Sequence, residues 1–206
     1  KALDAWRMTR GAGVTVAVLD DGFDLGHEEF AGKITYSYDY FNGDADASPN
    51  AYDYHGTPCA GLIAAAADND KGIAGVAPEA NLILMKVGEV QDPEGPAAGQ
   101  VFFGNVTTAQ AFVDAADRGA DVISCSWELG YFDVVASAIN YAATEGRNGR
   151  GCVIFFSSGN DSGPITNEYA TLPEVIAVGA TTALETRPGY SNYGPELDLV
   201  APSAPG

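Results

Sequence analysis

Residues 13–22 read GVTVAVLDDG, a short run of β-branched and apolar residues that ends in Asp20, Asp21 and Gly22. Such a run, closed by turn-forming residues, predicts a buried strand. Similar apolar runs recur along the chain and alternate with segments typical of helices, which indicates an α/β fold with a mainly parallel sheet covered on both faces. The expected strands are 81–87, 121–126, 152–157 and 175–179, and the expected helices are 56–67, 107–118 and 134–145.

Length and composition narrow the class of protein. The 206 residues, 46% of them hydrophobic and 18% charged, predict a packed globular chain of one large or two small domains. The net charge of −18 argues against a nucleic-acid partner and suits solubility, cation binding or attraction of basic substrates. No stretch is long and apolar enough for a membrane span, and the first residues do not resemble a signal peptide. Three cysteines without CxxC spacing predict small buried thiols, at Cys59, Cys125 and Cys152.

Three polar residues stand where the carboxyl ends of parallel strands would meet, which is where ligands gather in such sheets. Asp20 ends the first strand, His55 opens the expected helix 56–67, and Asn160 follows an apolar strand within FFSSGND. Taken one at a time, they read as a turn residue, a capping histidine and a loop amide. Together they supply an acid, a base and a hydrogen-bond donor for a developing oxyanion, in that chain order.

The sequence around these residues resembles the subtilisin family of serine proteases. VAVLDDGFDLGHEEF (16–30) is similar to the segment of the catalytic Asp, YHGTPCAGLIAA (54–65) to that of the catalytic His, and VIFFSSGN (153–160) to the oxyanion segment. The resemblance implies a three-layer subtilisin-like fold in which residues 1–206 form the N-terminal major part of one catalytic domain. It also implies a serine endopeptidase in which His55 is the base, Asp20 orients it and Asn160 binds the oxyanion.

Within that family, three residues resemble the kexin/furin branch: Asp21 after the catalytic Asp, Cys59 near the His, and Trp127 in SCSW. This likeness, with the acidic charge, predicts preference for Arg or Lys before the cut bond. The residues expected to bind substrate are Asp21, Asp53, Ser126, Trp127, Glu128 and Asp133. The alternative is that these acids are solvated or hold calcium, which would leave a broad apolar pocket. Two departures from furin weaken the basic preference: the missing acidic run after Trp127 and an acid absent from VTTAQAF (106–112).

The nucleophile is the largest departure. The family's GTSxA-type segment does not occur within the 206 residues, and Ser203, which follows Ala201 and Pro202, lacks its helix-opening context. The expectation is that a C-terminal fragment of the same precursor, cleaved but still associated, carries the serine. The alternative is a catalytically inactive pseudoprotease or binding module with the same fold.

The resemblance also implies calcium and an extracytoplasmic location. Subtilisin-like proteases often bind Ca²⁺ between an acid that follows the catalytic Asp and the loop after the histidine helix. Here these positions are Glu29 and ADNDKGI (67–73), with Asn69 as the best side-chain ligand and Asp68 or Asp70 as rivals. Oxygen ligands of this kind suit Ca²⁺. The alternative is a polar surface turn without a metal.

Overall fold

The computed structural model describes residues 2–92, 94 and 101–204. A seven-stranded sheet runs through the centre in the order β2-β3-β1-β6-β7-β8-β9, and all its neighbouring strands are parallel. These strands are β1 (Thr15–Asp20), β2 (Ile34–Asp39), β3 (Asn81–Lys86), β6 (Val122–Cys125), β7 (Val153–Ser157), β8 (Val175–Thr182) and β9 (Leu199–Ala204). The described chain also forms a small antiparallel hairpin of β4 (Gly88–Val90) and β5 (Val101–Phe103).

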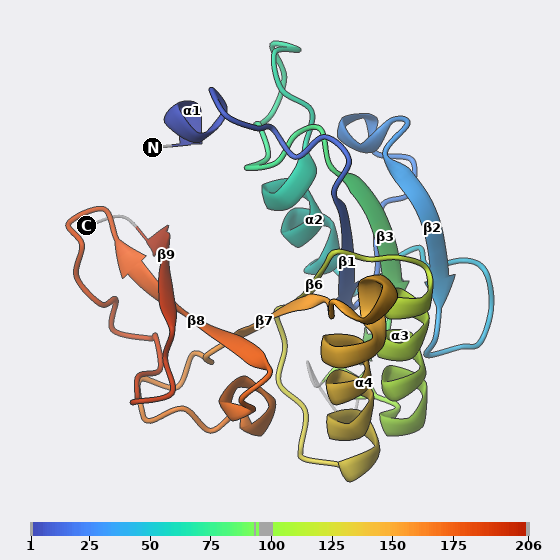
Figure 1. Cartoon of the computed structure of the whole chain (residues 1–206), viewed down its shortest axis with the longest axis vertical. Coiled ribbons are helices and arrows are strands. Elements are labelled where there is room, and N and C mark those ends of the chain that lie inside the picture. The colour runs from blue at the N-terminus through green and yellow to red at the C-terminus, as the bar shows by residue number, and fades with distance from the viewer. Residues whose placement is uncertain (1, 93, 95–100, 205–206) are drawn as a thin grey trace.

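Helices cover the two faces of this sheet, as the sequence predicts (Figure 1). Helices α3 (Asn105–Asp117) and α4 (Asp133–Gly149) pack together on one face, and α2 (Gly56–Ala64) lies on the other. The remaining elements are short: α1 (Ala2–Ala5), η1 (Glu28–Phe30) and η2 (Glu168–Thr171). The three-layer α/β architecture expected from the sequence is therefore confirmed.

Strand β1 shows why the central strands read as continuous apolar runs. Its residues alternate between two cores, with Ala17 and Leu19 packed in the core under α3 and α4, and Val16 and Val18 in the core under α2. Successive side chains of a strand point to opposite faces, so a strand buried on both sides needs apolar residues at every position. The packing on both faces places the carboxyl end of β1, with Asp20, at the edge of the sheet.

The structure differs from the predicted elements mainly at their ends. Helix α2 stops at Ala64 rather than 67, because the chain leaves the helix at Ala65 with a ψ of 144°. The regular turns of α4 end at Glu145, as predicted, because Gly146 leaves helical geometry with a ψ of 160° and Arg147 and Asn148 have positive φ before the segment ends at Gly149. Strand β2 was not predicted, since ITYSYD mixes polar and aromatic residues. Residues 90–100, VQDPEGPAAGQ, are rich in Pro and Gly, which predicts a surface loop, and this segment lies largely outside the described residues.

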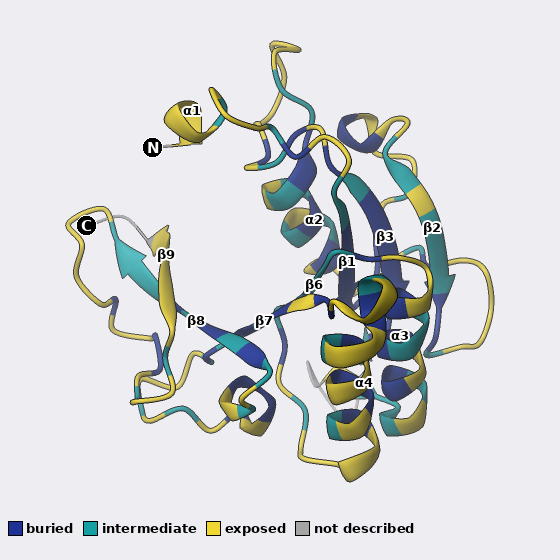
Figure 2. Ribbon diagram, in the orientation of Figure 1, coloured by how far each residue is buried: buried dark blue, intermediate teal, exposed yellow. Residues whose placement is uncertain are grey.

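Burial is uneven across the sheet (Figure 2). Strands β1 and β3 are buried along most of their length, whereas β9 leaves Leu199 and Val200 more than half exposed. A groove of about 210 Å³ opens on the neighbouring part of the sheet. It is lined by Ser124, Cys125, Ser126, Phe155, Phe156, Ser157 and Val178. No helix in the described part of the chain combines the length and hydropathy that a membrane crossing requires.

Candidate active site

Asp20 and His55 meet at the carboxyl end of β1. His55 immediately precedes α2, and its Nδ1 lies 2.8 Å from Oδ1 of Asp20. Asp20 is only 3% exposed, while about half of the His55 side chain is accessible. The buried carboxylate raises the pKa of His55 through this hydrogen bond, and the nearby Cys59 thiol raises it further. In this pair, a buried carboxylate fixes the orientation of an imidazole that is partly exposed to solvent.

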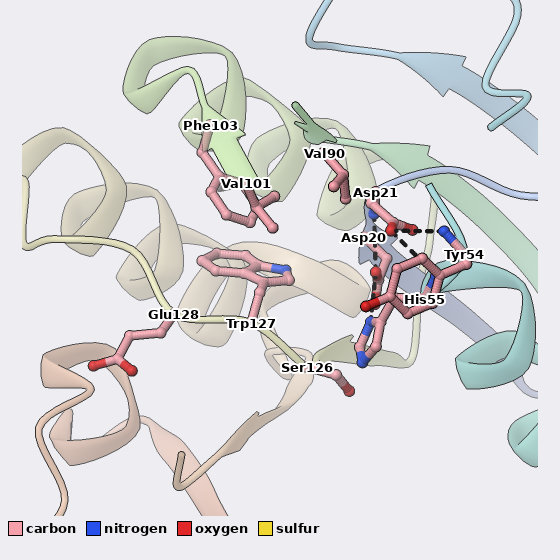
Figure 3. Close-up of a pocket in the computed structure, with 10 residues that line it drawn as sticks. All are labelled: Asp20, Asp21, Tyr54, His55, Val90, Val101, Phe103, Ser126, Trp127 and Glu128. Atoms are coloured by element: carbon pink, nitrogen blue, oxygen red, sulfur yellow. Dashed lines mark hydrogen bonds and ion pairs between the residues drawn. The ribbon is translucent and has the colours of Figure 1, made fainter. Parts of the chain in front are cut away.

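Asp21 holds the backbone around His55 in place. Its Oδ1 accepts a hydrogen bond from Gly56 N at 2.7 Å. Its Oδ2 accepts from His55 N at 3.1 Å and from Tyr54 N at 3.2 Å (Figure 3). Burial raises the pKa of Asp21, and the bond from Gly56 opposes that rise. The sequence predicts a substrate ligand here, but the structure commits both carboxylate oxygens to the amides at the start of α2.

A pocket of about 360 Å³ opens beside His55 (Figure 3). Its walls come from the ends of β1 and α2, from both strands of the hairpin, and from the segment after β6. The lining residues are Asp20, Asp21, Tyr54, His55, Val90, Val101, Phe103, Ser126, Trp127 and Glu128. The Trp127 indole is buried and donates to Leu19 O at 2.7 Å, which ties this wall to β1. The pocket therefore joins apolar side chains, Val90, Val101 and Phe103, to the polar groups of Asp20 and His55, a combination typical of binding sites.

The other predicted substrate residues divide into two groups. Ser126, Trp127 and Glu128 line the pocket, and Glu128 also accepts a hydrogen bond from the Thr166 hydroxyl at 3.2 Å. Asp133 begins α4 and does not line the pocket. Asp53 does not line it either, and its buried carboxylate forms an ion pair with Lys86 at 2.8 Å.

Asn160, the predicted oxyanion donor, follows β7 just after Gly159, whose φ is +97°. It is exposed, and it is not among the residues that line the pocket beside His55. The structure therefore places Asn160 at the expected carboxyl edge of the sheet without directing it into that pocket.

The cysteines are free thiols, as expected for Cys59, Cys125 and Cys152. Cys125 and Cys152 are buried, and Cys152 donates to Ala120 O at 3.0 Å. Cys59 is only partly buried, and its sulfur lies 3.6 Å from Nδ1 and 3.8 Å from Nε2 of His55. This contact follows from the helix, since residues four apart share one face.

The predicted calcium residues come together in part. Glu29 is buried, and its Oε2 accepts from the Asn69 amide at 3.0 Å. Asp68 instead pairs with Arg10 at 2.9 Å, and the carboxylates of Glu29, Asp68 and Asp70 form no cluster of three within 4.8 Å in the described part of the chain. Glu29 and Asn69 thus fit a hard cation only if the Asn69 oxygen turns inward and backbone carbonyls complete the shell.

Several residues of the site escaped prediction from sequence. Val90, Val101 and Phe103 form a pocket wall because β4 and β5 pair across a loop, and neither three-residue strand has a strong periodic signal. Tyr54 lines the pocket because it directly precedes His55 in the chain. An aromatic residue before a histidine is the only sequence signal for this role, and it is a weak one.

A family model, curated proteins and a solved structure were compared with this chain, and all of them point to the same family. The family model described as "Subtilase family" matches residues 11–205. The chain is 36% identical to a "Calcium-dependent protease" of Trichormus variabilis, over 97% of this chain and 31% of that protein. It is 32% identical to "Thermitase" of Thermoactinomyces vulgaris, over 99% of this chain and 68% of that protein. The crystal structure of a cold adapted subtilisin-like serine proteinase superposes with a TM-score of 0.73 at 27% identity, covering 94% of this chain and 64% of that one. The chain thus spans about a third of the length of the calcium-dependent protease.

Proposed function

Since this chain belongs to the subtilase family, we propose that it forms the larger part of the catalytic domain of a serine endopeptidase. The observation that carries the proposal is the 2.8 Å contact between Asp20 and His55, both of which line a pocket of about 360 Å³. In this role, Asp20 fixes the tautomer of His55 and stabilises its imidazolium, as the acid of a Ser-His-Asp triad does.

The ring of His55 is held by Asp20 on one side, and its other nitrogen points away from Asp20, toward the side where Ser126 lies (Figure 3). In the proposed reaction, this nitrogen takes the proton of a serine hydroxyl as the oxygen attacks the peptide carbonyl. It then gives the proton to the leaving amine as the carbon–nitrogen bond breaks. Asn160 is proposed to donate to the oxyanion, which requires its exposed side chain to turn toward the reacting carbonyl.

The serine is proposed to come from a segment outside residues 1–206. Within the described residues, no serine hydroxyl is hydrogen-bonded to His55. The groove on β6–β8 and the exposed apolar residues of β9 supply a surface on which such a segment would pack. Whether it is joined to this chain or is a cleaved, associated fragment is decided by the masses of all polypeptides in the purified enzyme. Labelling by a fluorophosphonate distinguishes the enzyme from an inactive pseudoprotease or binding module.

Preference for Arg or Lys before the cut bond is the finer part of this proposal. It is supported by Glu128 in the pocket and by the net charge of −18, which attracts basic segments. Asp21 and Asp53 no longer support it, because their carboxylates bind protein groups. The kexin-like assignment rests on Asp21, Cys59 and Trp127 alone. Fluorogenic peptides that differ only at this residue test the preference, and faster cleavage after Phe or Leu would reject it.

Calcium binding by Glu29, Asn69 and the carbonyls of residues 67–73 is proposed as a structural role. Two observations support it: Glu29 is buried without a lysine or arginine within ion-pair distance in the described chain, and the 36%-identical relatives are named calcium-dependent proteases. When bound, the ion would neutralise Glu29 and fix the loop that follows α2. We further propose that the enzyme acts on peptides or proteins outside the cytoplasm, and fractionation of the source cells tests this.

A further inference from the structure

A buried cluster of charges lies next to the pocket and takes no part in the proposed chemistry. Lys86, the last residue of β3, is 2% exposed, and its Nζ lies 2.8 Å from Oδ2 of Asp53 and 4.0 Å from Oδ2 of Asp39. The side chain of Asp53 is completely buried. Removing such charges from water is costly, and an apolar pair would often be at least as stable. The cluster is therefore better explained by what the carboxylate holds in place.

The second oxygen of Asp53 binds the edge of the hairpin. Its Oδ1 accepts a hydrogen bond from Val90 N at 2.8 Å, at the end of β4. Asn50 completes the attachment, because its amide donates to Val90 O at 3.3 Å while its backbone N–H donates to Oδ2 of Asp53 at 2.9 Å. Side chains of the 50–53 turn thus satisfy both backbone groups of Val90, as a neighbouring strand would.

Val90 is where this attachment reaches the pocket. Its side chain lines the pocket together with Tyr54 and His55, and its strand partner Val101 lies on the same wall (Figure 3). Asp53 also stands two residues before His55. One buried carboxylate therefore joins the sheet, through Lys86, to both the turn before the histidine and the wall formed by the hairpin.

We propose that Asp53, held by Lys86, is a positioning residue that fixes β4 as the wall against which substrate residues on the acyl side of the cut bond are bound. This inference rests on the proposed protease function. An extended peptide gains affinity from ordered backbone and side-chain contacts along such a wall, and a preorganised wall lowers the entropy lost on binding. A short substrate that does not reach β4 gains nothing from it.

The decisive experiment compares two peptides in the complete enzyme, including its serine-bearing segment. One peptide has two residues before the cut bond and the other has four. Asp53→Asn should lower kcat/KM for the longer peptide about tenfold, mainly through KM, and change the shorter one less than twofold. Equal losses on both peptides, with a lower melting temperature, would show a purely structural role and overturn the proposal.

Hydrogen exchange of the Val90 amide supplies a readout that is independent of catalysis. Asp53→Asn should speed this exchange at least tenfold while leaving the β1 amides unchanged, and unchanged exchange at Val90 would overturn the proposal. If Asp53→Asn fails to fold, Asn50→Asp keeps the turn's oxygen acceptor but removes the donor to Val90 O, and it should produce the same peptide-length effect. Asp44→Asn, which alters an exposed carboxylate on the same loop, is the matched control and should change neither readout.

If the wild-type enzyme cuts neither peptide, the protease proposal fails, and the specificity role of Asp53 fails with it. Faster exchange at Val90 in Asp53→Asn would still show that Asp53 holds β4. Cleavage of both peptides by wild type, with the longer peptide unaffected in the variant, would instead leave the protease intact and overturn only the specificity role.

Discussion

Replacing Asp21 by alanine tests whether this carboxylate serves the fold or the substrate. In the structure it accepts three backbone hydrogen bonds, from Gly56, His55 and Tyr54, and it is only 4% exposed. A hydrogen bond to a charged group contributes about 1.5–3 kcal/mol. The two longer bonds share one oxygen, so we count them as one, which gives a gross loss of about 3–6 kcal/mol.

Two effects reduce that loss. The buried carboxylate no longer has to be kept out of water, and some of the released N–H groups bind water at the start of α2. We therefore expect Asp21→Ala to lower the free energy of unfolding by about 3 kcal/mol, near the gross minimum. For a domain of this size, that corresponds to a fall in Tm of about 6–12 °C.

The assay combines urea denaturation of the complete enzyme with cleavage of two peptides. They carry either Arg or Ala at the second residue before the cut bond, which is the residue that the kexin-like resemblance implies Asp21 would contact. Asp21→Ala should lower stability and slow both peptides alike, because His55 loses its anchor. Asp44→Ala, at an exposed position, should change stability by less than about 0.5 kcal/mol. A loss under about 1 kcal/mol in Asp21→Ala, with selective loss of cleavage of the Arg peptide, would refute the anchoring role and restore the substrate role.

Three further outcomes are expected. Asp20→Asn should reduce kcat about 10⁴-fold. It should also move the acid limb of the pH–rate profile to lower pH, because Asp20 raises the pKa of His55 and only neutral His55 acts as a base. An acid limb at the wild-type pH would contradict the pairing. EDTA should lower the Tm of the wild-type enzyme, by an amount equivalent to about 2.7 kcal/mol if calcium was at 100 times its Kd. It should leave the Tm of Glu29→Gln unchanged. An equal wild-type Tm with and without EDTA would refute the proposed calcium site. Gly56→Ala should cost about 3 kcal/mol in urea denaturation, because a Cβ there would collide with Gly22 O, and wild-type stability would show that this contact relaxes freely.

The sequence predicts the sheet and the Asp20–His55 pair because the signals for both are local. A strand buried on two faces has apolar residues throughout, and a polar residue at its end lies at the edge of the sheet. The apolar runs thus place β1, β3, β6, β7 and β8 correctly. The ends of strand β9 were harder to predict, since LVAPSA combines residues typical of strands with residues typical of turns.

The roles of the acids were less predictable, because a carboxylate's partner is set by tertiary structure. Asp53 meets Lys86 across 33 residues of sequence, and its charge alone cannot indicate whether it faces substrate or a buried ammonium. The same applies to Asp68, which pairs with Arg10, 58 residues earlier in the chain. It applies to Asp21 as well, because the amides that its carboxylate binds, from Tyr54 to Gly56, lie 33 to 35 residues further along the chain.

The most direct test of the central claim is fluorophosphonate labelling of the complete enzyme, followed by mapping of the labelled peptide and measurement of the labelling rate in His55→Ala. We predict that one serine outside residues 1–206 is labelled, and that His55→Ala slows the labelling by at least about 10³-fold. Rapid labelling that does not depend on His55, or no labelling of an enzyme that contains its serine-bearing segment, would contradict the assignment of His55 as the base of a serine protease.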